Sequence, residues 1–325
     1  MKKDFSNFIK SIYQISKDFS IYADLQLRNI DYQTTGSTSN IDQLVVDKKY
    51  SFFNPKAGLN YDINQKNKIY FSLSKAHREP TRSDFENNIN IQPEELIDYE
   101  LGWKYNAEKF FFNSNLYYMG YKNQLVLTGA LDDVGSPIRE NSGKSYRTGI
   151  EIESVYKATN KLNISANISL SENKNIDYKT NYNGVITDWG DTDISFSPNV
   201  ISSAGIQFSA SQDLTFTLLN KFVGNQYMSN TESNISKLSS YSTTDLNILY
   251  TIENSALWMF GSAYFSEIIV TAMINNIFNK EYVSNGYYYT YDDTWSDPNL
   301  ITTIEGTGYY PQAKRNFLIG LTFKL

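Results

Sequence analysis

The only histidine of this chain, His77, lies in a run of charged residues, KAHREPTR, that could bind an anion. Arg78, Glu79 and Arg82 complete the run. Guanidinium groups bind carboxylates and phosphates through paired hydrogen bonds, so one interpretation is a ligand-binding cluster where a strand enters a long loop. The other interpretation is a network of ion pairs that anchors the loop. We expect no metal site here, because no second histidine and no cysteine are available as ligands.

Two further segments carry aromatic residues that could hold the flat face of a ligand. NGYYYTYDDTW contains Tyr287, Tyr288, Tyr289 and Trp295, and TDWGD contains Trp189. Such rings can stack on the aromatic group of an iron chelator, on a porphyrin or on a sugar. Aromatic residues are also common at the membrane surfaces of barrel proteins, so a purely structural role stays open. The aspartates near these segments lack the spacing of a calcium-binding loop, and we expect no metal there either.

Composition excludes several classes of function. A single histidine, no cysteine and no Gly-x-Ser-x-Gly turn leave no constellation for nucleophilic catalysis, and no glycine-rich loop could hold a phosphate. A net charge of -6 and a pI near 5.0 disfavour a nucleic-acid partner, which requires clustered lysine and arginine. We therefore expect neither an enzyme nor a nucleic-acid-binding protein, and no cofactor.

Extended strands must position these residues, because apolar and polar side chains alternate along almost the whole chain. In KLNISANISLS, from Lys161 to Ser171, every second residue is apolar, and the residues between are Asn or Ser. Alternation of this kind places the two sets on opposite faces of a strand. Segment 256–274 is apolar enough to resemble a membrane helix, but Glu267 near its centre and its β-branched residues favour a turn followed by a strand. The predicted strands are 5–16, 18–30, 47–62, 66–77, 93–106, 109–124, 145–157, 161–173, 197–211, 213–225, 239–252, 266–278 and 314–325.

Short and long connections alternate between these predicted strands. INQK, NAEK and ATNK are short turns, whereas 78–92, 125–144 and 279–313 are long. A transmembrane barrel has short turns at one end and long loops at the other. Strands of about 11 to 14 residues, tilted by about 40°, span an apolar layer of about 25 Å and are longer than those of most globular domains. The pattern predicts an all-β, antiparallel transmembrane β-barrel whose apolar face contacts lipid.

The C-terminal sequence resembles that of a known family. INNIFNKEYV, followed by YYPQAKRNFLIGLTFKL, is similar to the last two strands of TonB-dependent outer-membrane receptors. SLSKAHREPTRSDF and PEELIDYELGWKY resemble mid-barrel segments of that family, particularly of its Bacteroidetes-like members. The resemblance covers essentially the whole chain. The final residues resemble the family's signal for membrane insertion, carried here by Leu318, Gly320, Phe323 and Leu325.

The resemblance implies a fold, a location and a function. It implies one domain over residues 1–325, the C-terminal part of the barrel, with about 12 to 13 of roughly 22 strands and no plug domain. We therefore expect a fragment, located in the bacterial outer membrane, in contact with lipid and with the barrel-insertion machinery. The implied function is uptake of a scarce nutrient, driven by the TonB complex through a plug domain that this chain lacks. A ferric siderophore or similar iron chelate is the preferred ligand over haem, cobalamin or a glycan.

Two other functions stay open at the level of sequence. The first is a self-contained passive outer-membrane channel of about 12 to 14 strands, since small barrels can close within that range. The second is a soluble all-β binding module, although its strands would be unusually long.

Overall fold

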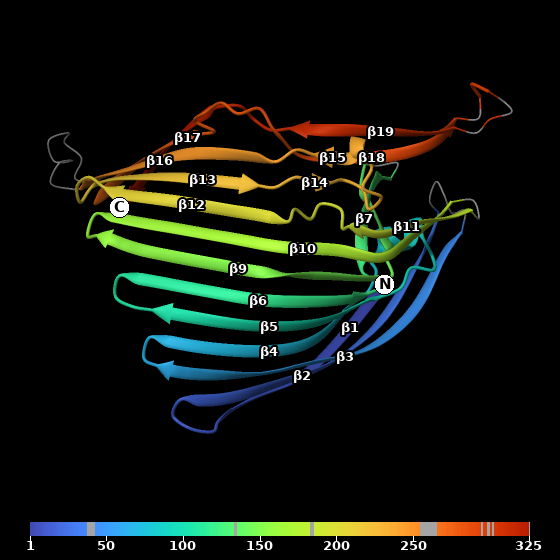
Figure 1. The fold of residues 1–325 in the computed structure, drawn as a ribbon, viewed down its shortest axis with the longest axis horizontal. Helices are drawn as coiled ribbons and strands as arrows, with labels where there is room; N and C mark the ends of the chain where they lie inside the picture. The colour runs from blue at the N-terminus through green and yellow to red at the C-terminus, as the bar shows by residue number, and fades with distance from the viewer. Residues whose placement is uncertain are drawn as a thin grey trace.

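The structure is a computed structural model, and it describes residues 1–37, 43–132, 135–182, 185–253, 265–293, 295–297, 300 and 302–324. One large antiparallel sheet runs through almost the whole of this part of the chain (Figure 1). Its hydrogen-bonded order is the chain order, so each strand returns beside the one before it. The strands are, in sheet order, β1 (Lys2–Gln14), β2 (Phe19–Gly36), β3 (Leu44–Asn64), β4 (Asn67–Arg78), β5 (Glu94–Asn106), β6 (Phe110–Lys122), β9 (Lys144–Thr159), β10 (Leu162–Tyr182), β12 (Val200–Ser209), β13 (Leu214–Val223), β16 (Tyr241–Glu253), β17 (Glu267–Asn275) and β20 (Asn316–Lys324).

These strands confirm the thirteen predicted from alternation, and β2, β3 and β10 extend several residues beyond their predicted ends. The strand at Glu267–Asn275 confirms the strand predicted in segment 256–274. The turn predicted before it falls largely in residues 254–264, which lie outside the described residues. Within the part of the chain that the structure describes, no helix is long and apolar enough to cross a lipid bilayer.

Polar side chains close several of the short turns. Between β3 and β4, the Asn64 Oδ1 accepts hydrogen bonds from the backbone N–H groups of Lys66 and Asn67, at 2.9 and 3.0 Å. Between β12 and β13, the Ser211 hydroxyl accepts from the backbone of Asp213 and Leu214. Asn and Ser favour turns because their side chains can satisfy backbone groups that have no strand partner. These short connections lie together at one end of the sheet, on the left in Figure 1.

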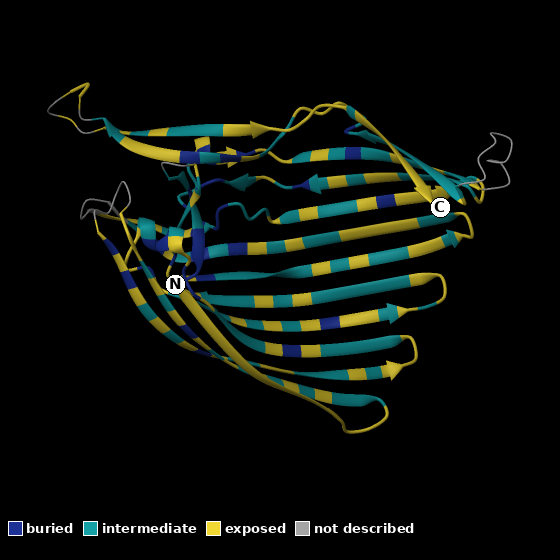
Figure 2. Cartoon of the chain, turned by 180° about the vertical axis from the view of Figure 1, so that it is seen from behind, coloured by how far each residue is buried: buried dark blue, intermediate teal, exposed yellow. Residues whose placement is uncertain are grey.

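The two faces of the sheet differ in chemistry as predicted. On β20 the apolar residues at odd positions are exposed, and Ile319 reaches 79% exposure. On the other face polar side chains bond across strands, as Asn54 does with Gln26 at 3.0 Å and Asn167 with Ser203 at 2.7 Å. Figure 2 shows exposed and less exposed residues alternating along most strands. An apolar outer face and a polar inner face are typical of a membrane barrel wall.

The wall is open in this structure. β1 and β20 lie at the two ends of the strand order, and no pairing between described residues joins them. A self-contained channel of 12 to 14 strands would require such a pairing, because an open edge leaves backbone groups unsatisfied in lipid. The described residues therefore give that alternative no support.

The long connections are structured rather than plain loops, which the sequence pattern did not predict. They gather at the other end of the sheet, called here the loop-bearing end, on the right in Figure 1. β11 pairs only with β10, and the remaining elements form small units of their own. These elements are α1 (Arg82–Asn87), β7 (Leu125–Leu131) with β8 (Pro137–Asn141), β11 (Val185–Asp193), β14 (Gln226–Tyr227) with β15 (Lys237–Leu238), the 3-10 turn η1 (Asn234–Ser236), and β18 (Val283–Asp293) with β19 (Thr302–Pro311).

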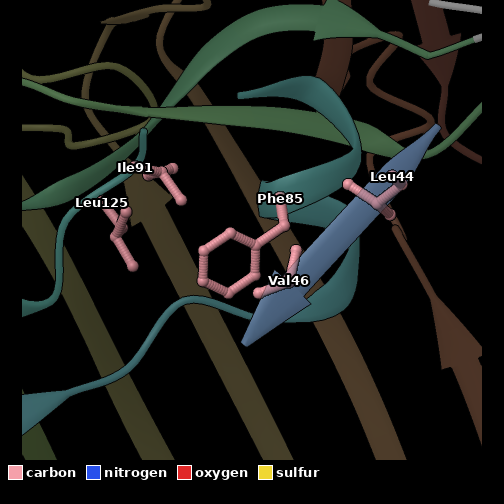
Figure 3. Packing of buried hydrophobic residues seen from close by; sticks show 5 residues of the cluster. All are labelled: Leu44, Val46, Phe85, Ile91 and Leu125. Atoms are coloured by element: carbon pink, nitrogen blue, oxygen red, sulfur yellow. The ribbon is translucent and has the colours of Figure 1, made fainter. Parts of the chain in front are cut away.

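Two small apolar cores lie at the loop-bearing end. The first core joins β3, α1 and β7 (Figure 3). The Tyr32 ring of β2 stacks on Phe85, with ring centres 5.6 Å apart. The second joins the loop before β15 to β18. Both cores connect elements far apart in sequence, so the long connections pack on one another. The first core consists of Leu44, Val46, Phe85, Ile91 and Leu125, and the second of Met228, Leu238 and Tyr288.

Candidate functional site at the loop-bearing end

The β7–β8 hairpin connects two distant parts of the rim. On one side Leu125 packs with Leu44 and Val46 of β3 in the first core. On the other side the hairpin contacts β18, and Gly129 lies against the backbone of Met228. β3 and the β17–β20 region lie near opposite ends of the strand order. The hairpin therefore crosses the concave side of the sheet at its loop-bearing end.

A buried carboxylate fixes the hairpin to α1. Arg139 of β8 donates from its Nε and Nη2 to the two oxygens of Asp84, at 2.9 and 2.8 Å. The same carboxylate accepts the backbone N–H of Thr81 at 2.6 Å and so caps the start of α1. Asp84 is buried, and these donors satisfy a charge that would otherwise be costly there.

A buried amide fixes the hairpin to the opposite part of the rim. The side chain of Asn230 donates to the Leu127 carbonyl at 2.8 Å and accepts the backbone N–H of Ser195 at 2.9 Å. Asn175 of β10 donates to the same Asn230 oxygen at 3.3 Å. Asn175 and Asn230 are 0% and 1% exposed, so this network is shielded from bulk solvent and loss of one of its bonds is costly.

A second contact on that side pairs two titratable groups. The hydroxyl of Tyr178, on the part of β10 that extends beyond its pairing with β9, donates to the carboxylate of Glu140 in β8. Burial raises the pKa of Glu140, and the hydrogen bond from Tyr178 offsets part of that rise. Burial and the charge of Glu140 raise the pKa of Tyr178 as well. Both groups therefore hold their protons more strongly than they would in water.

The charged run around His77 is divided by the structure. Glu79 is buried and accepts hydrogen bonds from Lys2 at 2.6 Å and from two nitrogens of Arg28 at 2.8 Å. Arg82 lies on α1 and pairs with Glu86 of the same helix at 2.6 Å. Glu79 thus forms ion pairs of the kind that anchors a loop, whereas the pair of Arg82 stays within its own helix.

The other two residues of the run have different surroundings. The His77 ring stacks on Phe52 at 4.9 Å, its Nδ1 lies 2.8 Å from the Asn54 Oδ1, and its Nε2 lies 3.4 Å from Glu95. Arg78 is exposed, and its side chain has no hydrogen bond or ion pair with the described residues. The four side chains do not converge on one point. A ligand-binding role for them remains a prediction.

The structure brings three of the predicted aromatic residues together and separates Tyr288 and Trp189 from them. Tyr287 and Tyr289 lie on one face of β18 and lead through Tyr291 to Trp295 in a row of near-parallel rings. Tyr288 points to the opposite face, is 7% exposed, and donates to Glu305. Burial, together with that bond, raises the pKa of Tyr288 to about 12.

Trp189 lies away from this row, on β11. Its ring is exposed and its Nε1 donates to Thr180 of β10 at 3.0 Å. The residues of the predicted insertion signal lie on β20, with the exposed Phe323 on the apolar face and Leu318 and Gly320 on the other. Leu325 lies outside the described residues.

A hollow on the concave face was not anticipated from the sequence. It has a volume of about 280 Å³ and lies between β2 and β5. Lys68 pairs with Asp62 at 3.3 Å, and the Lys104 ammonium lies 5.2 Å from the centre of the Tyr70 ring. Lysines at inward positions of consecutive strands are the signal that could have revealed it. The hollow is lined by Tyr22, Lys56, Asn60, Lys68, Tyr70, Ser72, Glu100 and Lys104.

Long strands, an apolar outer face, a polar inner face and structured connections at one end define the wall of an outer-membrane-type β-barrel. The chain belongs to the family described as TonB dependent receptor-like, beta-barrel, whose model matches residues 3–277. This family sits in the outer membrane of Gram-negative bacteria. The predicted fold class and family are therefore confirmed.

Solved structures extend the similarity to the rest of the chain. The siderophore receptor PiuA from Acinetobacter baumannii aligns with a TM-score of 0.73 and 16% identity, over 99% of this chain and 43% of that one. The copper transporter OprC aligns at 0.70 and 15%, over 99% and 48%. The ferric yersiniabactin uptake receptor FyuA from Yersinia pestis aligns at 0.68 and 14%, over 98% and 45%. This chain thus spans less than half the length of these proteins. No curated protein matches it in sequence.

Proposed function

We propose that this chain forms part of the wall of an outer-membrane receptor for TonB-dependent uptake of an iron chelate such as a ferric siderophore. The observation that carries the proposal is membership of the receptor-barrel family over residues 3–277. Several structural neighbours are named for iron uptake, including a siderophore receptor, a ferric yersiniabactin receptor and a ferric citrate transporter. The fold is also similar to that of a copper transporter. The competing substrate class is therefore a chelate of a metal other than iron.

The same proposal assigns the partners. The exposed apolar face contacts outer-membrane lipid. The C-terminal strand is bound by the barrel-insertion machinery. Energy comes from the TonB complex, through a plug domain that the described residues do not contain. The ligand is a scarce nutrient, with haem, cobalamin and glycans as the alternatives to an iron chelate.

Chelate capture is proposed to begin at cationic groups on the rim and to continue along the concave face. Arg78 is exposed and unpaired among the described residues, and the Arg82 side chain is exposed on α1 close to it in sequence. Many iron chelates are anionic, and arginine binds carboxylate and similar groups through paired hydrogen bonds. Lys56 and Lys104 in the concave hollow present further positive charge along the inner face. His77 lies between these two regions and orders the end of β4 through Phe52.

Uptake of radioactive iron by the native host tests this function. Cells under iron limitation receive ferric citrate, a ferric catecholate or a ferric hydroxamate, with the gene intact, deleted or restored, and with the TonB system active or inactivated. We expect uptake of one chelate to require both the gene and the TonB system. Equal uptake of all chelates after deletion, or gene-dependent uptake that persists without the TonB system, would overturn the proposal. Copper, haemin, cyanocobalamin and malto-oligosaccharides serve as comparison substrates.

A further inference from the structure

The outer surface of the β18–β19 hairpin carries four aromatic rings in a line, called here the aromatic row: Tyr287, Tyr289, Tyr291 and Trp295. Their successive ring centres are 6.2, 6.4 and 6.0 Å apart, and successive planes differ by 25°, 17° and 6°. The last three rings are 42%, 42% and 71% exposed. The row is therefore an extended, evenly spaced aromatic surface rather than part of a core.

Glycines on β19 make room for two rings of the row. Tyr287 pairs with Gly308 and Tyr289 with Gly306 in the register of the hairpin. A Cβ atom added at Gly306 would collide with the Tyr289 ring, and one at Gly308 would collide with the Tyr287 ring. Each ring thus lies over the neighbouring strand, packed on a glycine, and presents its remaining surface to the outside.

The row faces away from the concave side of the sheet. On the opposite face of the hairpin, Tyr288 packs with Met228 in the second core, and Tyr309 donates to the Ile235 carbonyl. Residues on that face thus contact the connection between β14 and β15, which is also hydrogen-bonded to β7 through Asn230. Because neighbouring side chains on a strand point to opposite faces, Tyr287, Tyr289 and Tyr291 point outward. A ligand that moves along the inner face would not meet them.

The charge around the row disfavours anionic ligands. Residues 283–311 contain no lysine, arginine or histidine. Of their four acidic residues, Asp292 and Glu305 lie on the opposite face of the hairpin, whereas Asp293 lies on the face of the row. An iron chelate with free carboxylates, a porphyrin with propionates or a phosphorylated sugar would meet like charge without a compensating cation. The chemistry that remains is a neutral molecule with flat apolar faces and hydroxyl groups.

We propose that the aromatic row binds a neutral polysaccharide outside the cell, along a chain of uncharged pyranose units. The C–H face of a pyranose packs on an aromatic ring, and a linear row suits a ligand that repeats along one direction. The hydroxyls of Tyr287, Tyr289 and Tyr291 have no hydrogen-bond partner among the described residues, and they are available to sugar hydroxyls. This site is separate from the proposed uptake route, so each can be tested without the other.

Binding of neutral hexasaccharides to the purified full chain in detergent micelles tests the site. Maltohexaose, cellohexaose and laminarihexaose are titrated while Trp fluorescence and heat are recorded, with a galacturonate hexamer as the anionic probe. We expect at least one neutral hexasaccharide to bind and the anionic one not to bind. Absence of binding by all three neutral probes, or preference for the anionic probe, would overturn the proposal.

Variants locate the binding to the row. Tyr289→Ala is expected to weaken binding about tenfold, the upper range for loss of one aromatic contact. Gly306→Ala retains all four rings but displaces Tyr289 from the sheet, and we expect it to weaken binding as well. Tyr309→Ala removes a similarly exposed tyrosine from the opposite face of the same hairpin and should change affinity less than twofold, a loss well below one aromatic contact. Equal affinity of Tyr289→Ala and the unaltered chain would place any sugar elsewhere and refute the site.

A measurement in cells separates this inference from the uptake proposal. Tyr289→Ala should leave uptake of the iron chelate unchanged, because the row lies outside the inner face. Loss of chelate uptake in this variant would contradict the assignment of the row to a separate ligand. Loss of sugar binding with normal chelate uptake supports both proposals.

Discussion

Arg139 and Asp84 are 55 residues apart in sequence, yet the Arg139 guanidinium donates two hydrogen bonds, of 2.9 and 2.8 Å, to the buried Asp84 carboxylate. Asp84 also caps α1, so one carboxylate joins a helix start to the β7–β8 hairpin. The far side of the same hairpin is held by Asn230 and by the Glu140–Tyr178 pair. The hairpin is thus fixed at both sides of the concave surface, and its attachment can be tested contact by contact.

Replacing Arg139 with Met should release the hairpin from α1. Asp84 would retain its bonds from Thr81 but lose both charged donors, at a cost of about 2 to 3 kcal/mol in local stability. Hydrogen exchange of peptides 82–87 and 125–141 measures the change. Arg82→Ala on the exposed side of α1 is the control and should have little effect. Equal exchange in Arg139→Met and the unaltered chain would show that the pair does not hold the hairpin.

Replacing Gly129 with Ala should disrupt the contact of β7 with the loop at Met228. The residue has a φ of +92°, and an added Cβ would collide with the Met228 carbonyl. Gly135→Ala is the matched control, because its φ is +83° but no atom lies within 4 Å of the added Cβ. Both variants incur backbone strain of about 1 to 2 kcal/mol, so any additional loss of stability in Gly129→Ala measures the collision. Thermal unfolding and exchange of residues 226–238 measure it, and equal losses would argue against the contact.

The Glu140–Tyr178 pair predicts that the hairpin is held more firmly in acid. Burial raises the pKa of Glu140 above its ordinary value of 4.5, so the attached hairpin binds a proton that the released hairpin loses. Attachment is therefore strongest below pH 4.5 and weakens as pH rises from there through the raised pKa. Exchange of residues 137–141 at several pH values, corrected for the intrinsic rate, measures this.

Glu140→Gln isolates that effect. The amide oxygen can still accept the Tyr178 hydroxyl but does not titrate, so we expect the pH dependence to disappear while attachment at neutral pH is retained or improved. Tyr178→Phe leaves the buried carboxyl without its donor and should weaken attachment by about 1 to 3 kcal/mol. A pH dependence that survives in Glu140→Gln would assign it to another group.

The ion pairs of Glu79 predict the opposite pH dependence for the stability of β1, the first strand. Burial raises the pKa of Glu79, but hydrogen bonds from Lys2 and Arg28 lower it more, and the net pKa lies below its ordinary value of 4.5. Its stabilisation is present above pH 4.5 and is lost as pH falls through the lowered pKa. Glu79→Gln should cost about 1.5 to 3 kcal/mol near neutral pH and abolish the acid sensitivity.

Exchange of residues 2–14 reads out this change, because Lys2 lies on β1. Asp31→Asn removes a long, exposed ion pair with Lys49 on the neighbouring strands and is the control, with little expected change. Equal hydrogen exchange of residues 2–14 in Glu79→Gln and Asp31→Asn would show that the buried ion pairs of Glu79 do not stabilise β1 more than an exposed pair does.

The strands of this protein were predictable because their information is local. Alternation with a period of two can be read within ten residues, as in the segment from Lys161 to Ser171, and asparagine and serine turns such as Asn64 mark where strands end. The curved wall then follows from strand order, since short turns make each strand pair with its predecessor. The family resemblance at the C-terminus depended on the same local patterns.

The candidate site was predicted only in part. The sequence located charged and aromatic residues in the long connections but could not say which side chains share a face. Glu79 and Arg82 are three residues apart in the charged run, yet Glu79 pairs with β1 and β2 and Arg82 pairs within its own helix. Tyr288 lies between two members of the aromatic row and points the opposite way, into a core. The small strands in these connections were missed because sequences such as LVLTGAL and TTIEGTGYYP do not alternate regularly between apolar and polar residues, although each strand pairs with a neighbour close in sequence.

By itself the sequence determined that this chain builds an antiparallel wall with one apolar and one polar face, because alternation acts on each strand separately. Only the tertiary structure decided where the long connections pack, that Asp84 meets Arg139, that Glu140 meets Tyr178, and that the aromatic row faces outward. Those outcomes depend on contacts between residues tens of positions apart. Their energies come from burial and hydrogen bonding in the assembled fold, which no short stretch of sequence contains.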